Sequence, residues 1–262
     1  MTESVSTNPR KKAAAARAQQ LAKEKRRERT VKLIGGIVVL LVVVAIIGGA
    51  WWFSRKSSGP SGPDAAAASP KGVNTTTYAY PVNNAAPPTA PVVQAWEDFQ
   101  CPGCKGFEEK YGSTLYPAAL KGDINLQLRP TTFLDGASGH SKSASALATA
   151  AWGCAIDAGK ALEYHSAVYA LPQSSPTNFT PDQLIGVAEQ VGITGGALDT
   201  FRSCLTSSPP MYAGWAANSQ AQFEADGISG TPTLIVNGKD LDLAKVTTPE
   251  SLLAAIQAAP KS

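Results

Sequence analysis

An uncharged run of 21 residues, Leu33 to Phe53, limits what this chain can fold into more than any other feature. As an α-helix rising about 1.5 Å per residue, the run would span roughly 32 Å, which matches one crossing of a bilayer. A cleaved signal peptide is the alternative, but its apolar core is usually about 7 to 15 residues long. Trp51 and Trp52 stand where aromatic side chains gather at a membrane interface. We therefore expect an uncleaved transmembrane anchor at residues 33–53.

The charges around this run predict its orientation. Residues 1–32 carry ten Lys or Arg and three Glu, a net charge of +7, whereas the whole chain carries +3. Because the basic side lies inside, we expect the N-terminus in the cytoplasm and the chain after residue 54 outside the cell membrane. A nucleic-acid-binding protein would usually spread basic residues over its folded domain. The basic tail is therefore expected to contact anionic lipids, and no nucleic acid partner is expected.

A folded domain is expected at the end of a tether. Residues 54–72 are small, contain proline and lack apolar periodicity, which is typical of a flexible linker. We place the linker at residues 54–87, with a short edge strand at Thr75–Tyr80. The folded domain is expected at residues 88–262.

The start of this domain has the pattern of a strand, a helix and a second strand. An apolar strand is predicted at Pro91–Phe99 and an alternating strand at Ile124–Leu128. Between them, Phe107, Tyr111 and Leu115 recur at helical spacing. These elements predict a βαβ unit.

The rest of the domain is predicted to be helical and then to return to the sheet. We expect a helical insertion at about residues 138–226, with helices ending at Ala158 and covering 162–171, 181 onward, 197–205 and 210–225. A strand at Thr233–Val236 should then form a hairpin through Asn237-Gly238 with a strand at Asp240–Val246. A final helix is expected from Pro249 to about Ala258. The predicted class is α/β.

Two of the four cysteines form a CPGC motif at the junction between the first strand and its helix. This position places Cys101 at the helix N-terminus, where unpaired N–H groups and the helix dipole stabilise a thiolate. Pro102 suits the first helical position, and Gly103 completes the turn. Cys101 is therefore the candidate nucleophile, and Cys104 is the candidate resolving thiol.

Other roles for this motif fit less well. A zinc site would need a second pair of ligands, but Cys154, Cys204, His140 and His165 occur singly. Covalent haem attachment would need a histidine at the position of Lys105. A purely structural CxxC would not explain the junction of strand and helix. We expect no metal and no cofactor beyond the cysteines themselves.

At this point the chain resembles the DsbA-like thioredoxin-fold oxidoreductases, in the bacterial branch that often carries a membrane anchor. The resemblance covers about residues 88–258 and rests on residues 98–105 (DFQCPGCK), 227–233 (GISGTPT) and 236–238 (VNG). It implies a thioredoxin fold with an inserted helical domain. It also implies a cis bond at Thr231-Pro232 that faces the cysteine pair and binds extended substrate chains.

The sequence departs from this family at two places. Many thioredoxin-fold enzymes have an acidic residue six positions before the first cysteine, where this chain has Ala95. Glu97 or Asp98, or water, would have to accept the proton of the inner thiol. The Pro-Gly dipeptide also lacks the histidine of strongly oxidising members, so the oxidising strength stays open.

The remaining cysteines, histidines and aromatics are expected to be structural. Cys154 and Cys204 fall in different predicted helices, and a structural disulfide is their natural assignment, as in some relatives; two buried free thiols are the alternative. His140 and His165 are predicted to be surface or packing residues. Four aromatics should pack the insertion, namely Trp152, Tyr212, Trp215 and Phe223, with a substrate groove as the alternative for Tyr212 and Trp215.

Taken together, the sequence predicts a membrane-tethered, extracytoplasmic enzyme that forms or rearranges disulfides in exported polypeptides. A membrane redox partner would reoxidise the CPGC pair. One alternative is a thiol reductase, for example for apocytochromes. The other is a non-enzymatic extracellular binding module whose disulfides are only structural.

Overall fold

The computed structural model describes residues 67–172 and 178–260, all of which belong to one compact unit. The predicted cytoplasmic tail, the anchor and the linker up to residue 66 lie outside the described residues. Within the described ranges, no helix is both long enough and apolar enough to cross a membrane.

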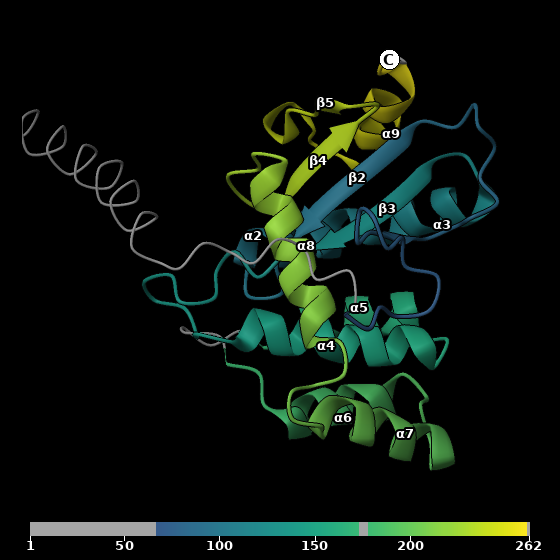
Figure 1. The fold of residues 1–262 in the computed structure, drawn as a ribbon. Helices are drawn as coiled ribbons and strands as arrows, with labels where there is room; N and C mark the ends of the chain where they lie inside the picture. The colour runs from purple at the N-terminus through teal and green to yellow at the C-terminus, as the bar shows by residue number, and fades with distance from the viewer. Residues whose placement is uncertain (1–66, 173–177, 261–262) are drawn as a thin grey trace, which may run out of the picture. The chain divides into compact units, whose positions relative to one another are not determined.

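A five-stranded sheet forms the framework of the domain, with strand order β1-β3-β2-β4-β5 (Figure 1). The central strand β2 runs parallel to β3, and the other pairs are antiparallel. Buried residues from both faces of β2 explain its central place, since Val93, Ala95 and Trp96 are all covered. The strands are β1 (Tyr80–Pro81), β2 (Val92–Glu97), β3 (Asn125–Pro130), β4 (Thr233–Val236) and β5 (Lys239–Asp240).

The predicted hairpin after β4 has the expected turn but a shorter second strand. Asn237 and Gly238 have φ values of 49° and 79°, the positive pair that a type I′ turn requires. The strand expected at residues 240–246 was wrong in length, because β5 ends at Asp240. A 3₁₀ turn, η2 (Leu243–Lys245), follows instead, and the Asp242 side chain caps it by accepting from the amide of Ala244.

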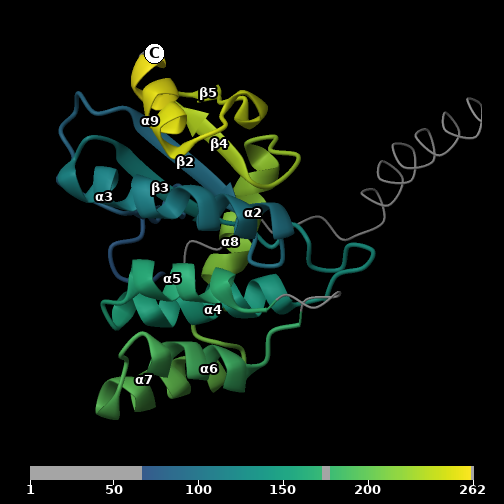
Figure 2. The same cartoon turned by 180° about the vertical axis from the view of Figure 1, so that it is seen from behind.

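Helices cover both faces of the sheet, as the two opposite views show (Figures 1 and 2). The helix α8 (Ala213–Ala225) lies on one face. The other face carries α9 (Pro249–Ala258) and a continuous helical run that contains a π-helical turn. This run consists of α2 (Pro102–Phe107), η1 (Glu108–Gly112) and α3 (Ser113–Lys121).

The helical insertion between β3 and β4 packs in layers beside the sheet (Figure 1). Its first helix is buried along most of its length, because its alanines let neighbouring helices approach closely. The inserted helices are α4 (Ala144–Asp157), α5 (Ala161–Ala170), α6 (Pro181–Gln190) and α7 (Gly195–Thr206). The thioredoxin-like fold with a helical insertion is therefore confirmed.

The middle of the predicted linker, residues 67–73, packs on the helices of the domain. A Cβ atom at Gly214 would lie 2.6 Å from the Cβ of Ala67, and one at Gly153 would lie 2.9 Å from Cγ of Pro70. The backbone amide of Lys71 also donates to Asp157 at 2.8 Å. The two glycines leave room that larger residues would fill, so residues 67–73 belong to the folded domain.

The aromatics expected to pack the insertion are buried, with one difference. Trp152 and Trp215 have ring centroids 5.5 Å apart, and the indole N–H of Trp215 donates to the carbonyl of Tyr78. Phe223 instead packs against Trp96 of the sheet, with ring centroids 5.4 Å apart. This difference follows from the position of α8, which lies on the sheet as well as beside the insertion.

Candidate active site

The topology brings the CPGC motif and the Thr231-Pro232 loop to the same end of the neighbouring inner strands β2 and β4. Cys101 follows the end of β2, and β4 runs antiparallel to β2, with Trp96 opposite Thr233. The residues just before β4 therefore lie beside those just after β2. The peptide bond between Thr231 and Pro232 is cis, and the Cys101 thiol lies 3.3 Å from the carbonyl oxygen of Thr231.

Cys101 is the N-cap residue of α2. Its backbone is extended, and its Sγ accepts a hydrogen bond from the amide of Cys104 at 3.4 Å. Pro102 occupies the first turn, where its missing N–H costs no hydrogen bond. The Cys101 thiol thus takes the place that an oxygen acceptor usually has at a helix start, which favours a negative charge on the sulfur.

The surroundings of Cys101 lower its pKa from the ordinary value of 9.0 to about 5. The largest cause is a hydrogen bond from the Cys104 side chain; burial opposes it, and the Thr231 side chain and the amides of Cys104 and Gly103 add to it. Cys101 is therefore mostly a thiolate at neutral pH when the pair is reduced, although no histidine stands in the dipeptide.

Cys104 has the opposite properties. Its side chain is completely buried, whereas Cys101 is 7% exposed. Burial raises the pKa of Cys104 well above its ordinary value, and the hydrogen bond to Cys101 and the charge of Glu97 raise it further. Both cysteines are free thiols in the structure. One thiol therefore ionises readily near the surface, and the other keeps its proton in the interior.

Glu97 is the buried acid beside the inner thiol. The position six residues before Cys101 is Ala95, which is buried in β2, as the sequence implied. Glu97, at the end of the same strand, is 3% exposed, and its charge acts on the pKa of Cys104. Burial raises the pKa of Glu97 well above its ordinary value, and the Glu108 charge adds to this effect.

Asp98, the other candidate acid, is occupied by structural hydrogen bonds. Its carboxylate accepts from the amides of Gln100 at 2.8 Å and Leu134 at 2.9 Å, and from the hydroxyl of Ser145 at 2.5 Å. The Gln100 side chain in turn donates to Asp135 at 2.7 Å and to Ser145 at 3.0 Å. These contacts tie the residues before the CPGC motif to the start of α4.

Gly103 and Lys105 fix how the motif meets its neighbours. A Cβ atom at Gly103 would lie 3.2 Å from Cδ of Pro232, so the small residue permits the close approach of the two loops. The Lys105 ammonium donates to the carbonyls of Tyr169 at 2.8 Å and Leu171 at 3.0 Å. Lys105 thereby caps the end of α5 and links it to α2.

Sequence reasoning missed a buried polar cluster behind the two thiols. His165 was expected to be a surface or packing residue, and it does pack among aromatic rings, but the sequence did not indicate the two carboxylates beside it. Its Nε2 lies 3.6 Å from Glu97 and its Nδ1 lies 3.8 Å from Glu108, and the ring is 2% exposed. The Tyr116 hydroxyl lies 3.0 Å from Nδ1 of His165 and 2.5 Å from Glu108.

Part of this cluster leaves a signal in the sequence. Glu108 follows Cys104 by four residues and precedes Tyr111 by three, so helical spacing places all three on one face. All three are buried, and Glu108 and Tyr111 lie in the π-helical turn η1. His165 lies in a buried stripe of α5 with Tyr164, Val168 and Tyr169, which a helical pattern could have predicted. Its carboxylate partners come from β2 and η1, however, and no local pattern indicates that contact.

The second cysteine pair lies in the insertion. Cys154 in α4 and Cys204 in α7 form a disulfide, with Cα atoms 6.0 Å apart and 50 residues between them in the sequence. Both residues are buried. The pairing is the one that the family resemblance implied.

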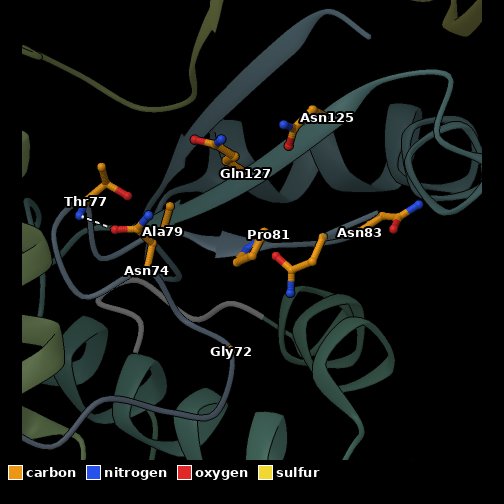
Figure 3. Close-up of a pocket in the computed structure, with 9 residues that line it drawn as sticks. Gly72, Asn74, Thr77, Ala79, Pro81, Asn83, Asn125 and Gln127 are labelled. Carbon is orange, nitrogen blue, oxygen red and sulfur yellow. Dashed lines mark hydrogen bonds between the residues drawn. The ribbon is translucent and has the colours of Figure 1, made fainter. Parts of the chain in front are cut away.

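A hollow of about 300 Å³ lies at the β1 edge of the sheet, away from the cysteines (Figure 3). Carboxamide side chains dominate its walls, including Asn74, Asn125 and Gln127. Asn74 already accepts hydrogen bonds from the amides of Thr76 and Thr77. Since no cysteine or charged group lines it, this hollow has no part in thiol chemistry.

Disulfide exchange needs one thiol that is readily attacked or attacks as a thiolate, and a second thiol that resolves the mixed disulfide. Cys101 has the lowered pKa of the first kind, and the buried Cys104 is placed as the second. The arrangement places the chain among the thiol:disulfide oxidoreductases with a thioredoxin fold. Residues 85–258 match the model of the thioredoxin family, and the chain belongs to that family.

Solved structures of several bacterial proteins are similar to this chain. The MdbA protein, a thiol-disulfide oxidoreductase from Actinomyces oris, is 22% identical, with a TM-score of 0.61 over 78% of this chain and 98% of its own. DsbA from Mycobacterium tuberculosis is 25% identical, with a TM-score of 0.54 over 68% and 90%. The disulfide bond oxidoreductase DsbG of the same organism is 26% identical, with a TM-score of 0.54 over 68% and 86%. None of the curated proteins compared with the chain matches it. The resemblance to DsbA-like disulfide oxidoreductases is confirmed.

Proposed function

We propose that the chain is a membrane-tethered, extracytoplasmic disulfide oxidoreductase that uses Cys101 and Cys104 to form or rearrange disulfides in exported polypeptides. The observation that carries this proposal is the difference between the two thiols at the start of α2. The surroundings lower the pKa of Cys101 to about 5, and burial raises the pKa of Cys104 well above its ordinary value.

The reaction needs no group other than cysteines. A substrate thiolate attacks Sγ of Cys101, the Cys101–Cys104 bond breaks, and Cys104 leaves as a thiolate that takes up a proton. A second substrate thiolate then attacks the mixed disulfide, so the substrate gains a disulfide and Cys101 is released as a thiolate. Two electrons pass from the substrate to the enzyme, and a membrane redox partner that accepts them restores the CPGC disulfide.

The stable Cys101 thiolate favours oxidation of substrates over their reduction. A protein that stabilises its reduced form gives up its disulfide more easily, which raises the reduction potential. Equilibration with glutathione buffers of known potential, followed by thiol counting, measures this quantity. We expect a value well above the roughly −270 mV typical of thioredoxin; a value near it would indicate a reductase, and one below about −300 mV a structural disulfide in a binding module.

The membrane tether rests on the sequence of residues 1–66. A protease added to intact cells or spheroplasts is expected to cut the segment before Ala67, because the folded domain begins there and the anchor would hold residues 33–53 in the bilayer. A soluble fragment containing both cysteine pairs should be released. A protected domain, or a mature chain that lacks residues 1–53, would contradict the tether.

A further inference from the structure

Cys104 changes its protonation state in every exchange cycle, although its side chain is completely buried. It takes up a proton when the CPGC disulfide is broken and loses one when the disulfide re-forms. A polypeptide bonded to Cys101 covers the exposed side of the pair during the reaction. The proton then has to travel through the interior of the protein, and Glu97 is the buried carboxyl on the inner side.

The contacts around Glu97 lead away from the two thiols. Both carboxylate oxygens of Glu97 are buried, and the polar groups beside them are the Glu108 carboxyl and the His165 ring. Nε2 of His165 lies 3.6 Å from one of these oxygens, and Nδ1 of the same ring lies 3.0 Å from the hydroxyl of Tyr116. That hydroxyl is held 2.5 Å from the Glu108 carboxylate. The two ring nitrogens of His165 therefore face opposite ends of one polar path.

The far end of this path reaches the surface. The Tyr116 hydroxyl is itself buried, but the side chain of the exposed Ser166 is a hydrogen-bond partner for it, and both residues line an open hollow of about 550 Å³ between β1, α3 and α5. Neither Cys101 nor Cys104 lines this hollow. Water in the hollow therefore stays in contact with bulk solvent when a substrate chain occupies the other side of the pair.

We propose that His165 and Tyr116 carry a proton between Glu97 and this hollow, so that Cys104 can exchange its proton while a polypeptide covers Cys101. The inference rests on the disulfide exchange activity proposed above. His165 and Tyr116 do not touch the reacting sulfurs and act through Glu97, so they are positioning residues for the proton.

The transfer is balanced at each atom. When the disulfide breaks, the Glu97 carboxyl gives its proton to the Cys104 thiolate. The Tyr116 hydroxyl, which donates its proton to Glu108 at rest, turns to Nδ1 of His165. Nε2 then gives a proton to Glu97 while Nδ1 takes the hydroxyl proton, and the tyrosine oxygen takes a proton from water in the hollow through the Ser166 hydroxyl, which leaves a hydroxide ion in the solvent. The same steps run in reverse when the disulfide re-forms.

The titratable and charged groups around Glu97 favour a protonated Glu97 carboxyl, which can donate its proton to Cys104. They are Cys101 and Cys104 from α2, Glu108 from η1, Tyr116 from α3, His165 and Tyr169 from α5, and the adjacent Asp98. Burial raises the pKa of Glu97 well above its ordinary value, so its carboxyl keeps a proton that it can donate. Burial also raises the pKa of Tyr116, which disfavours a free tyrosinate and favours concerted transfer.

The test is single-turnover reduction of the oxidised full-length chain in detergent, followed between pH 5 and 9 (a range set by the ordinary and lowered pKa of Cys101) in H₂O and D₂O. The reductants are dithiothreitol, which leaves the pair accessible to water, and an unfolded polypeptide with two thiols. The variants are His165→Gln and Tyr116→Phe. Their matched controls are His140→Gln, in an outer loop, and Tyr111→Phe, whose hydroxyl donates only to the carbonyl of Val246.

We expect both variants to slow reduction by the polypeptide by about 100-fold, the lower end of what a positioned proton donor or acceptor contributes. The pH profile should change and the solvent isotope effect should grow, whereas reduction by dithiothreitol should change much less. The control variants should match the wild type. Retention of the Cys154–Cys204 disulfide and of the thermal transition shows that a variant is folded, and Tyr116→Phe, which removes one oxygen, serves if His165→Gln does not fold.

Two results would overturn the proposal. One is a wild-type rate, pH profile and isotope effect in Tyr116→Phe and in a folded His165→Gln. The other is an equal loss with both reductants and an unchanged pH profile, which would mean that the cluster is only structural. Failure of the wild type to exchange with either reductant would instead reject the proposed oxidoreductase function, so the two failures are distinguishable.

Discussion

The carbonyl oxygen of Thr231 lies 3.3 Å from Sγ of Cys101, although the two residues are 130 positions apart in the sequence. They meet because β4 begins where the antiparallel strand β2 ends. A substrate cysteine bonded to Cys101 would therefore lie beside the backbone of Thr231. Main-chain pairing at this point would let the enzyme bind many polypeptides without reading their side chains.

The first prediction concerns the division of labour in the CPGC motif. Cys101→Ser should abolish exchange, because it removes the thiolate at the helix start. Cys104→Ser should trap mixed disulfides with substrates, since attack by Cys101 survives and resolution does not. Non-reducing gels and mass spectrometry of the trapped species measure both effects. Wild-type activity in either variant would reject the enzyme hypothesis.

A second prediction concerns the ionisation of Cys101. Thiolate absorbance of the reduced protein should titrate with a midpoint of about 5. Cys104→Ala should move this midpoint upward, because the hydrogen bond from Cys104 is the largest cause of the lowered pKa. Cys154 and Cys204 do not contribute to the signal while they are joined in a disulfide. An unchanged midpoint in the variant would show that the helix start alone stabilises the thiolate.

The same ionisation predicts a pH dependence of stability. Between about pH 5 and 9, Cys101 is a thiolate in the folded reduced protein and a protonated thiol in the unfolded chain. The unfolded state then binds more protons, so the stability of the reduced form rises with pH in this window and is lost as the pH falls through about 5. The oxidised form lacks this contribution. Denaturant unfolding of both forms at several pH values should show the reduced form losing stability relative to the oxidised form on acidification through this window.

A further prediction concerns the hydrogen bonds that hold the residues before the motif. Asp98→Ala would leave the buried amide of Gln100 and the half-buried amide of Leu134 without their acceptor, and we expect a loss of stability of about 1 to 3 kcal/mol. Asp123→Ala is the matched control, because Asp123 is exposed and its replacement should change stability by less than about 0.5 kcal/mol. Urea unfolding measures both. Equal effects of the two changes would contradict a structural role for Asp98.

Local sequence patterns predicted most of the helices and strands and the two reactive thiols. They did not predict contacts between residues that are far apart in the sequence. The CPGC motif, the Asn237-Gly238 turn and the start of the last helix at Pro249 each depend on neighbouring residues, so a single sequence predicts them. The contact of His165 with Glu97 depends on how an inserted helix packs against the sheet. The packing of residues 67–73 depends on space left by glycines far along the chain.

The last prediction concerns the second cysteine pair. The Cys154–Cys204 disulfide joins helices α4 and α7 of the insertion and closes a long loop, so it restricts the unfolded chain, whereas the CPGC motif lies at the start of α2. The double change Cys154→Ala, Cys204→Ala should lower stability by about 2 to 5 kcal/mol and leave exchange close to the wild-type rate. Mild reduction should open the Cys101–Cys104 disulfide first, because Cys101 is released as a stable thiolate, whereas Cys154 and Cys204 lie within helices of the insertion. Thiol counting by mass after graded reduction, together with thermal melts of the double variant, tests both parts. If the Cys154–Cys204 pair is reduced first, or if its removal stops exchange without destabilising the fold, then it is a second redox centre and not a structural link.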